Sequence, residues 1–275
     1  MKPTPITQFS DPRHASLARR ISVFAFGAVS YAIFFGVFLY LPGFFGNLLV
    51  PISIDGAPTH SFGIALLINL GLVALFGLQH SIMARPTFKR WWTKIIPLEA
   101  ERSFYTLLSA LLLIVLFTQW SPMGVTIWNA TDSAWRIALH GVMFTGWLIV
   151  LWTTFLINHF DLFGLRQIWL YLIGKPYTPV NFAQPGPYKR VRHPMYIGWL
   201  LMFWGAPTMT VAHLAAALGL TAYILIAIQF EERNLIDEHG DNYRNYKRRV
   251  PMLIPRLFDK TKPETATATA TSRAA

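Results

Sequence analysis

Long uncharged apolar runs alternate with short polar connections along this chain. A bilayer core about 30 Å thick requires a helix of roughly 20 predominantly apolar residues to cross it. Four runs of about that length precede residue 160, and another follows near the C-terminus, after a shorter run and a Pro-Thr-Met-Thr break. We therefore predict helices over residues 21–41, 61–84, 103–120, 136–158, 194–207 and 211–232.

The run over 194–207 is too short to cross a bilayer alone, and the next helix starts only a few residues later. We predict that these two segments form a helical hairpin that enters and leaves the membrane on the same side. The predicted fold class is all-α: a polytopic transmembrane helical bundle with five full spans and one short helix.

Basic residues gather on one side of the membrane in this predicted arrangement of helices. The chain has 24 Lys and Arg against 13 Asp and Glu, a net charge of +11. All but one of the basic residues lie before the first helix, in the connections 85–102 and 159–193, or in the tail. Because cytoplasmic loops are enriched in Lys and Arg, we predict that both termini are cytoplasmic. The positive charge therefore indicates topology, and we expect no nucleic-acid partner.

The composition favours one integral-membrane domain. Charged residues make up only 13% of the chain and hydrophobic residues 53%, unlike a soluble enzyme. We predict a cytoplasmic segment over 1–20, a single domain over 21–258 and a disordered Thr-Ala tail over 259–275. Because the first apolar run is longer than the core of a signal peptide, we expect it to be retained as a helix.

Common cofactor motifs are missing from the sequence. It has no G-x-G, which argues against a Rossmann fold, and no P-loop signature. The eight histidines are far apart, no H-E-x-x-H is present and there is no cysteine, so we expect no metal site and no cysteine nucleophile.

Polar side chains concentrate instead in the predicted cytoplasmic loop before the short helix. Pro185-Gly-Pro is a turn signal, and Pro194 suits the first turn of a helix. Arg192 and His193 then stand at the helix entrance, where free N–H groups and the positive dipole end suit a ligand carboxylate. Tyr196 and Gly198 follow inside the helix, and we expect the glycine to admit a flat ligand group. The alternative is that the basic residues only anchor the helix to lipid headgroups.

Two acidic residues, Glu231 and Glu232, end the last apolar run. Carboxylates at a membrane boundary suit a cationic ligand such as an ammonium or a sulfonium. The alternative is that they are solvated charges at a helix end. Because a short hairpin returns both clusters to the same side, a ligand with a carboxylate and an amine can bridge them.

These residues carry a resemblance. Arg192-His193-Pro194-Met195-Tyr196-Ile197-Gly198, followed by Glu231-Glu232 and Tyr243-x-x-Tyr246, resembles the superfamily of isoprenylcysteine carboxyl methyltransferases and phospholipid methyltransferases. The match covers 184–256. The stretches 83–92 and 157–166 are similar to a narrower branch, the methanethiol S-methyltransferases.

The resemblance implies an S-adenosylmethionine-dependent enzyme of the bacterial inner membrane, with its active site facing the cytoplasm. The implied activity is methylation of a small thiol, methanethiol, to dimethyl sulfide. The implied cofactor-binding residues are Tyr188, Arg192, His193, Pro194, Tyr196, Gly198, Glu231 and Glu232. Two other functions stay open: methylation of a lipid or prenylcysteine carboxylate, and a non-enzymatic transporter or structural role.

A thiol must ionise before it attacks a methyl group, so a proton acceptor is expected. His159 and Asp161 follow the fourth predicted helix on the cytoplasmic side. We predict that His159 accepts the thiol proton and that Asp161 stabilises the resulting imidazolium. His80, at the cytoplasmic end of the second helix, is a weaker candidate. The alternative is that Asn158 and His159 are polar residues at a helix end.

Overall fold

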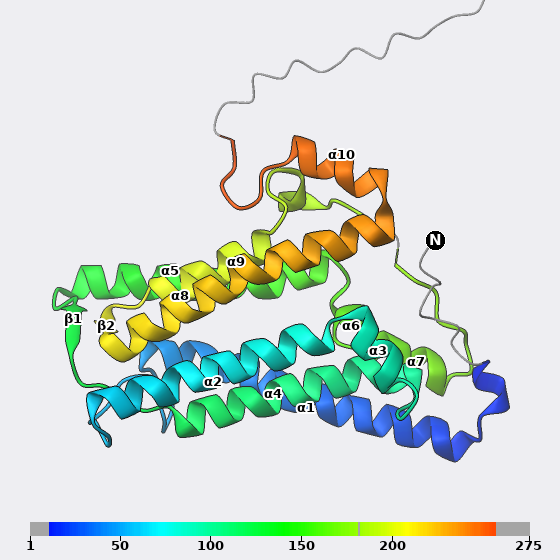
Figure 1. Cartoon of the computed structure of the whole chain (residues 1–275), viewed down its shortest axis with the longest axis horizontal. Helices are drawn as coiled ribbons and strands as arrows, with labels where there is room; N and C mark the ends of the chain where they lie inside the picture. The colour runs from blue at the N-terminus through cyan, green and yellow to red at the C-terminus, as the bar shows by residue number, and fades with distance from the viewer. Residues whose placement is uncertain (1–10, 181, 257–275) are drawn as a thin grey trace, which may run out of the picture.

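A computed structural model, which describes residues 11–180 and 182–256, is a bundle of helices (Figure 1). Within these residues, five helices are long and apolar enough to cross a membrane: α1 (Leu17–Gly46), α2 (Phe62–Met83), α4 (Glu101–Gln119), α5 (Ser133–Leu156) and α9 (Val211–His239). A shorter apolar helix, α8 (Pro194–Trp204), precedes α9. The predicted all-α transmembrane bundle with five full spans and one short helix is confirmed.

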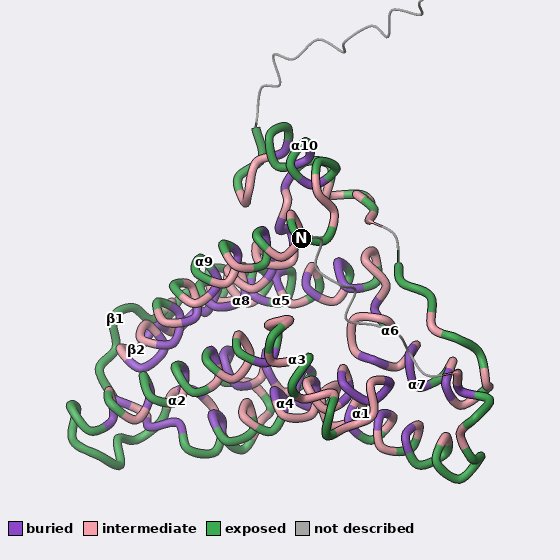
Figure 2. Tube along the Cα trace, turned by 45° about the vertical axis from the view of Figure 1, so that its right-hand side comes forward, coloured by how far each residue is buried: buried purple, intermediate pink, exposed green. Residues whose placement is uncertain are grey.

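The long helices form two layers, with α1, α2 and α4 in one and α5, α8 and α9 in the other (Figure 1). Helix α2 packs against both α4 and α9, and so it joins the two layers. The buried residues face the interior of the bundle, whereas outward faces are exposed (Figure 2). Many exposed side chains on the long helices are large and apolar, such as Leu67 and Ile137, which is the surface that a bilayer requires.

Two helices extend past the apolar runs that predicted them. Helix α1 begins at Leu17, where the side chain of Ser16 accepts a hydrogen bond from the backbone N–H of Arg19. Helix α9 continues to His239 and stops at Gly240, whose φ of +58° favours glycine. Hydropathy marks where a bilayer begins and ends, but the backbone hydrogen bonds of a helix continue until a capping residue ends them.

The predicted hairpin of α8 and α9 is present, and its turn contains a strand that hydropathy did not predict. Strand β2 (Thr208–Thr210) pairs antiparallel with β1 (Thr126–Asn129), from the connection after α4. The Val211 N–H also donates to the carbonyl of Val125 at 2.8 Å. This pairing satisfies the backbone groups of an extended segment at the far end of the bundle.

Helices α5 and α8 approach each other through glycines. A Cβ on Gly146 would lie 2.5 Å from the carbonyl oxygen of Gly198, and a Cβ on Gly198 would lie 2.6 Å from that of Gly146. Only glycine permits two helix backbones to come this close, as in small-residue contacts between membrane helices.

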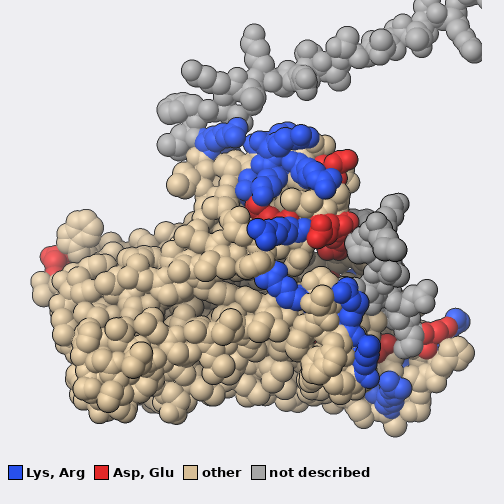
Figure 3. Space-filling model, in the orientation of Figure 1, with Lys and Arg blue, Asp and Glu red and all other residues tan. Residues whose placement is uncertain are grey.

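Short helices occupy the other end of the bundle. They are η1 (Pro12–His14), α3 (Pro86–Trp92), η2 (Leu98–Ala100), α6 (His159–Leu162), α7 (Leu165–Leu172), η3 (Gly186–Lys189) and α10 (Asp241–Arg249). Lys and Arg gather over this end in the space-filling view (Figure 3), and we refer to it as the charged end. The cytoplasmic placement of this end stays a prediction, as do the domain limits. The predicted tail over 259–275 lies outside the described residues.

Candidate active site

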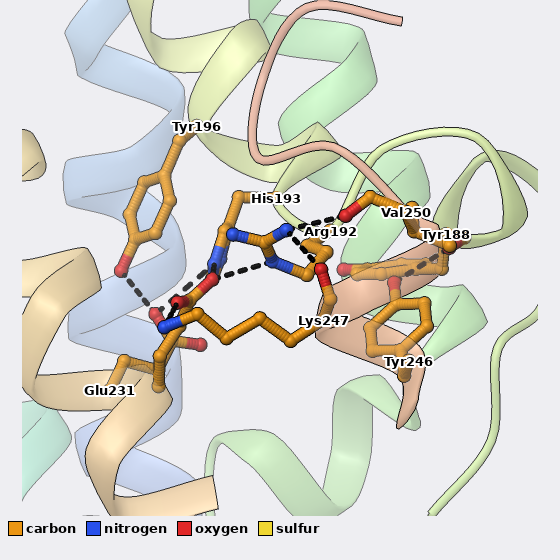
Figure 4. A network of polar contacts seen from close by, with 9 residues as sticks. Tyr188, Arg192, His193, Tyr196, Glu231, Tyr246, Lys247 and Val250 are labelled. Carbon is orange, nitrogen blue, oxygen red and sulfur yellow. Dashed lines mark hydrogen bonds and ion pairs between the residues drawn. The ribbon is translucent and has the colours of Figure 1, made fainter. Parts of the chain in front are cut away.

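Glu232, near the end of α9, is the centre of an ionic network, and its partners Arg192, His193 and Lys247 are labelled in Figure 4. The residue is 2% exposed. Its Oε1 accepts hydrogen bonds from Arg192 Nε at 2.6 Å and His193 Nε2 at 3.1 Å, and its Oε2 lies 2.6 Å from Lys247 Nζ. One carboxylate therefore joins the start of α8 to α9 and α10, and both of its oxygens are engaged.

The Arg192 guanidinium is occupied by the same network. Its Nη1 donates to the carbonyl of Lys247 at 3.1 Å and to that of Val250. The backbone N–H groups of Arg192 and His193 donate to two successive carbonyls of residues 251–252, at 2.9 and 3.1 Å. The segment after α10 therefore satisfies the backbone N–H groups of these two residues. Binding of a ligand carboxylate at the first turn of α8 stays a prediction.

Glu231 differs from its neighbour because its side chain is 44% exposed. Its Oε2 accepts a hydrogen bond from the Tyr196 hydroxyl at 2.8 Å and lies 3.8 Å from Nδ1 of His193. Since the Glu232 carboxylate can only accept, His193 Nε2 carries a proton, and in the neutral ring Nδ1 is an acceptor. Glu231 Oε2 and His193 Nδ1 thus form a pair of acceptors to which one ammonium can donate.

A group of aromatic residues closes the site on the side of α10. The Tyr246 hydroxyl donates to the carbonyl of Tyr188 at 2.6 Å, which ties the loop before α8 to α10 (Figure 4). Burial raises the pKa of Tyr246 to about 12. Burial also raises the pKa of Tyr188, and the nearby negative charge of Glu231 adds to the effect. Both phenols therefore stay protonated at neutral pH, and the Tyr246 hydroxyl is a hydrogen-bond donor.

Pro194 and Gly198 shape α8. Pro194 occupies the first turn of the helix, as predicted. A Cβ added to Gly198 would point at the backbone of α5, at Gly146 and Val150. The expectation that Gly198 admits a flat ligand group is therefore corrected: its small size admits a neighbouring helix.

His159 is buried against α1 and α5. Its Nε2 lies 2.7 Å from the Tyr31 hydroxyl, and its Nδ1 lies 2.7 Å from Oγ1 of Thr154. The Thr154 hydroxyl donates its proton to the carbonyl of Leu151, so it accepts from Nδ1–H. Nε2 is then the acceptor for Tyr31, and burial lowers the pKa of His159. Both ring nitrogens are therefore already hydrogen-bonded.

Asp161 does not support His159. Its carboxylate accepts hydrogen bonds from Arg166 Nη1 at 2.9 Å and from the Tyr177 hydroxyl at 3.2 Å. The predicted contact between Asp161 and the His159 imidazole is wrong, because residues two apart on a helical turn do not face each other. Asp161 instead fixes α7 and the segment that follows it.

Sequence reasoning missed Lys247 and the carbonyl of Val250. Lys247 stands on α10, one residue after Tyr246, inside the stretch that carried the resemblance. The available signal was the spacing of Tyr243 and Tyr246, which are both buried and place Lys247 on the adjacent side of a short helix. Among the described residues, no group of three or more His, Asp or Glu side chains is arranged to hold a metal ion.

A transmembrane bundle with this motif at its charged end belongs to the class of integral-membrane methyltransferases. The family model for phospholipid methyltransferases matches residues 140–242, which include all of α8 and α9 and, of the ionic network, Arg192, His193 and Glu232 but not Lys247.

Curated relatives define the family more narrowly. The chain is 50% identical to methanethiol S-methyltransferase of Crocosphaera subtropica, over 90% of this chain and 96% of the relative. It is 51% identical to methanethiol S-methyltransferase 2 of Bradyrhizobium diazoefficiens (89% and 94%) and 46% identical to the Mycobacterium tuberculosis enzyme of the same name (86% and 97%). The chain therefore belongs to the methanethiol S-methyltransferase family. No solved structure matches it.

Proposed function

We propose that this protein transfers a methyl group from S-adenosylmethionine to methanethiol and so forms dimethyl sulfide. Methanethiol as the methyl acceptor is supported by sequence identity of about half, over nearly the whole length of relatives named for this activity. S-adenosylmethionine as the methyl donor is supported by the two hydrogen-bond acceptors on Glu231 and His193, because this cofactor presents an ammonium group.

In this mechanism the chain's residues bind and orient. Glu231 and His193 Nδ1 would hold the amino group of the cofactor, and Tyr196 fixes the Glu231 carboxylate. Glu232, Arg192 and Lys247 keep His193 and α8 in place, and Tyr188 closes the site from the loop. When bound, the cofactor supplies an electrophilic methyl group on a sulfonium. Holding both reactants in line and excluding water accounts for most of the catalysis that such a transfer needs.

We further propose that the enzyme lies in the bacterial inner membrane with its charged end in the cytoplasm. The distribution of Lys and Arg supports this orientation (Figure 3). S-adenosylmethionine is then available to the site from the cytoplasm. His159 as the acceptor of the thiol proton stays a prediction, to be compared with a second histidine below.

The direct test supplies membranes containing the protein with methyl-labelled S-adenosylmethionine and methanethiol. We expect labelled dimethyl sulfide in the headspace. Label in the lipid fraction with none in the headspace would instead favour a lipid methyltransferase, the activity of the broader superfamily.

Glu231→Gln tests the cofactor site separately. Loss of the charge that faces the ammonium should weaken S-adenosylhomocysteine binding by about 10-fold or more, because a hydrogen bond to a charged group contributes roughly 1.5–3 kcal/mol. Glu238→Gln, an exposed glutamate on the same helix, is the matched control and should bind normally. Equal affinities in calorimetry would remove Glu231 from the site.

A further inference from the structure

His80 stands in the last turn of α2, between α4 and α9, where aromatic rings surround it. Its ring centre lies 4.9 Å from that of Tyr105, 5.4 Å from that of Phe76 and 6.3 Å from that of Tyr223. The residue is half-buried. Three helices, α2, α4 and α9, therefore present aromatic rings to one imidazole.

The hydrogen bonds of His80 define which ring nitrogen is basic. Nδ1 lies 3.2 Å from Oγ of Ser109, whose hydroxyl donates to Oε1 of Gln79 at 3.4 Å. Since the Ser109 proton is used there, Ser109 accepts from His80, and Nδ1 is the protonated nitrogen. Nε2 then carries the lone pair and has no hydrogen-bond partner among the described residues. This differs from His159, whose Nε2 already accepts from Tyr31.

His80 also lies at the right depth below the cofactor site. Helices α2 and α9 are packed together, with Tyr223 beside His80 and, further along, the Arg85 guanidinium 3.8 Å from the centre of the Phe230 ring. His80 is thus level with Tyr223, and Glu231 is eight residues further along α9. At 1.5 Å per residue, that is about 12 Å along the helix axis. Four bonds separate an amino nitrogen from a sulfur in a methionine side chain, or about 5 Å.

Tyrosine side chains stand beside both Glu231 and His80. Tyr196, which bonds Glu231, lies close enough to Tyr223 and Tyr105 to interact with both electrostatically. Aromatic faces attract cations, so this group favours a sulfonium placed between the ammonium site and the imidazole.

We propose that His80 Nε2 accepts the proton of the thiol substrate, an inference that rests on the proposed function. The S–H bond breaks and its proton moves to Nε2. The sulfur lone pair forms the new bond to the methyl carbon, and the carbon–sulfur bond of the donor breaks with its electron pair left on the donor sulfur. The positive charge thus passes from sulfonium to imidazolium, which the Nδ1–H bond to Ser109 stabilises.

The groups that face the ring are consistent with this role. They are Tyr105 and Ser109 from α4, Tyr223 from α9, and Gln79 and Phe76 from α2 itself. The charges that act on the two neighbouring phenols are those of Arg102, Glu101 and Glu231 on Tyr105, and of Glu231 and Arg85 on Tyr223. Among the described residues, no carboxylate is hydrogen-bonded to the ring, so it is free to begin the reaction neutral.

The test compares two acceptors in His80→Gln. With methanethiol, kcat/KM should fall by about 100-fold or more, the usual contribution of a positioned base, and the loss should shrink as pH rises toward the pKa of the thiol. With methaneselenol, which is already ionised at neutral pH, the loss should be under about 10-fold. His60→Gln, an exposed histidine before the other end of α2, is the control and should behave as wild type.

A second readout needs no turnover. His80→Gln should bind S-adenosylhomocysteine as wild type does, which also shows that it is folded. Methanethiol added to that complex should give the ultraviolet band of a thiolate in wild type and in His60→Gln, but not in His80→Gln. Ser109→Ala, which keeps the imidazole and removes its partner, should show a smaller loss that is again confined to the thiol.

Several results would overturn the proposal. They are equal losses with thiol and selenol, an unchanged thiolate band, or a thiol-specific loss in His159→Gln with none in His80→Gln. A wild-type protein that forms no dimethyl sulfide would instead refute the proposed function, so the two failures are distinguishable.

Discussion

Replacing Glu232 with glutamine tests whether this carboxylate holds the site together or binds the cofactor. The side chains of Glu232 and Arg192 are 3% and 9% exposed, and Arg192 would keep its charge without a counter-ion. Breaking a buried pair by removing one partner costs about 3–5 kcal/mol. An amide also presents N–H groups to Lys247 Nζ, which now lies 2.6 Å from a carboxylate oxygen. We therefore expect Glu232→Gln to lose about 3 kcal/mol or more in the free energy of unfolding.

The contribution of each partner can be separated by double mutants. The Lys247 side chain is 42% exposed, so water partly screens its ion pair with Glu232. The interaction free energy of this pair in a double-mutant cycle should be only about 1 kcal/mol. Adding Lys247→Met to Glu232→Gln should recover that amount, because it removes the clash between two donors. Unfolding in detergent, followed by circular dichroism, measures these differences, and Glu238→Gln is the surface control.

The opposite pattern would refute this reasoning. If Glu232→Gln unfolds with the wild-type free energy and loses only affinity for S-adenosylhomocysteine, then Glu232 is a ligand of the cofactor. If the coupling to Lys247 exceeds the coupling to Arg192, the assignment of Arg192 as the principal partner is wrong.

Two further predictions concern packing and pH. Gly146→Ala should lower the free energy of unfolding by about 1–3 kcal/mol, because its Cβ would meet the α8 backbone. Gly141→Ala, on the same helix, has open space and should be neutral or slightly stabilising. Thermal unfolding of the two variants measures the difference. Burial lowers the pKa of His159, so the unfolded chain binds a proton there at higher pH than the folded chain does, and stability should fall as the pH drops below about 6.5. In His159→Gln the slope of unfolding free energy against pH between 7 and 5 should be shallower, and an unchanged slope would contradict a buried neutral imidazole.

The bundle was predictable because each span carries its own signal. Uncharged runs revealed the five long helices and the short one, since a bilayer selects apolar residues over a fixed length. Strands β1 and β2 carried no such signal, because their pairing joins two short segments that lie far apart in the chain. Their position depends on where α8 ends, which apolar composition does not define.

The candidate site divides in the same way. The meeting of Arg192 and His193 with Glu232 follows from a hairpin, whose two arms must return to one end. The difference in burial between Glu231 and Glu232 does not follow from the hairpin. It depends on the position of α10, which buries the Glu232 carboxylate and leaves that of Glu231 exposed. The pairing of His159 with Asp161 failed for a local reason, since nearness in sequence does not bring two side chains together on one helical turn.

The length of α9 sets where the products leave. Its residues Val211–His239 extend about 44 Å at 1.5 Å per residue, whereas a bilayer core is about 30 Å thick, so the site is near the level where hydrocarbon gives way to water. On the proposed function, the nucleoside product is charged and leaves into the aqueous phase, and dimethyl sulfide is apolar and dissolves in the lipid. The two products thus partition differently, the nucleoside into water and the sulfide preferentially into lipid. The amount of membrane around the enzyme, and not only the concentration in solution, then governs how strongly the sulfide opposes turnover.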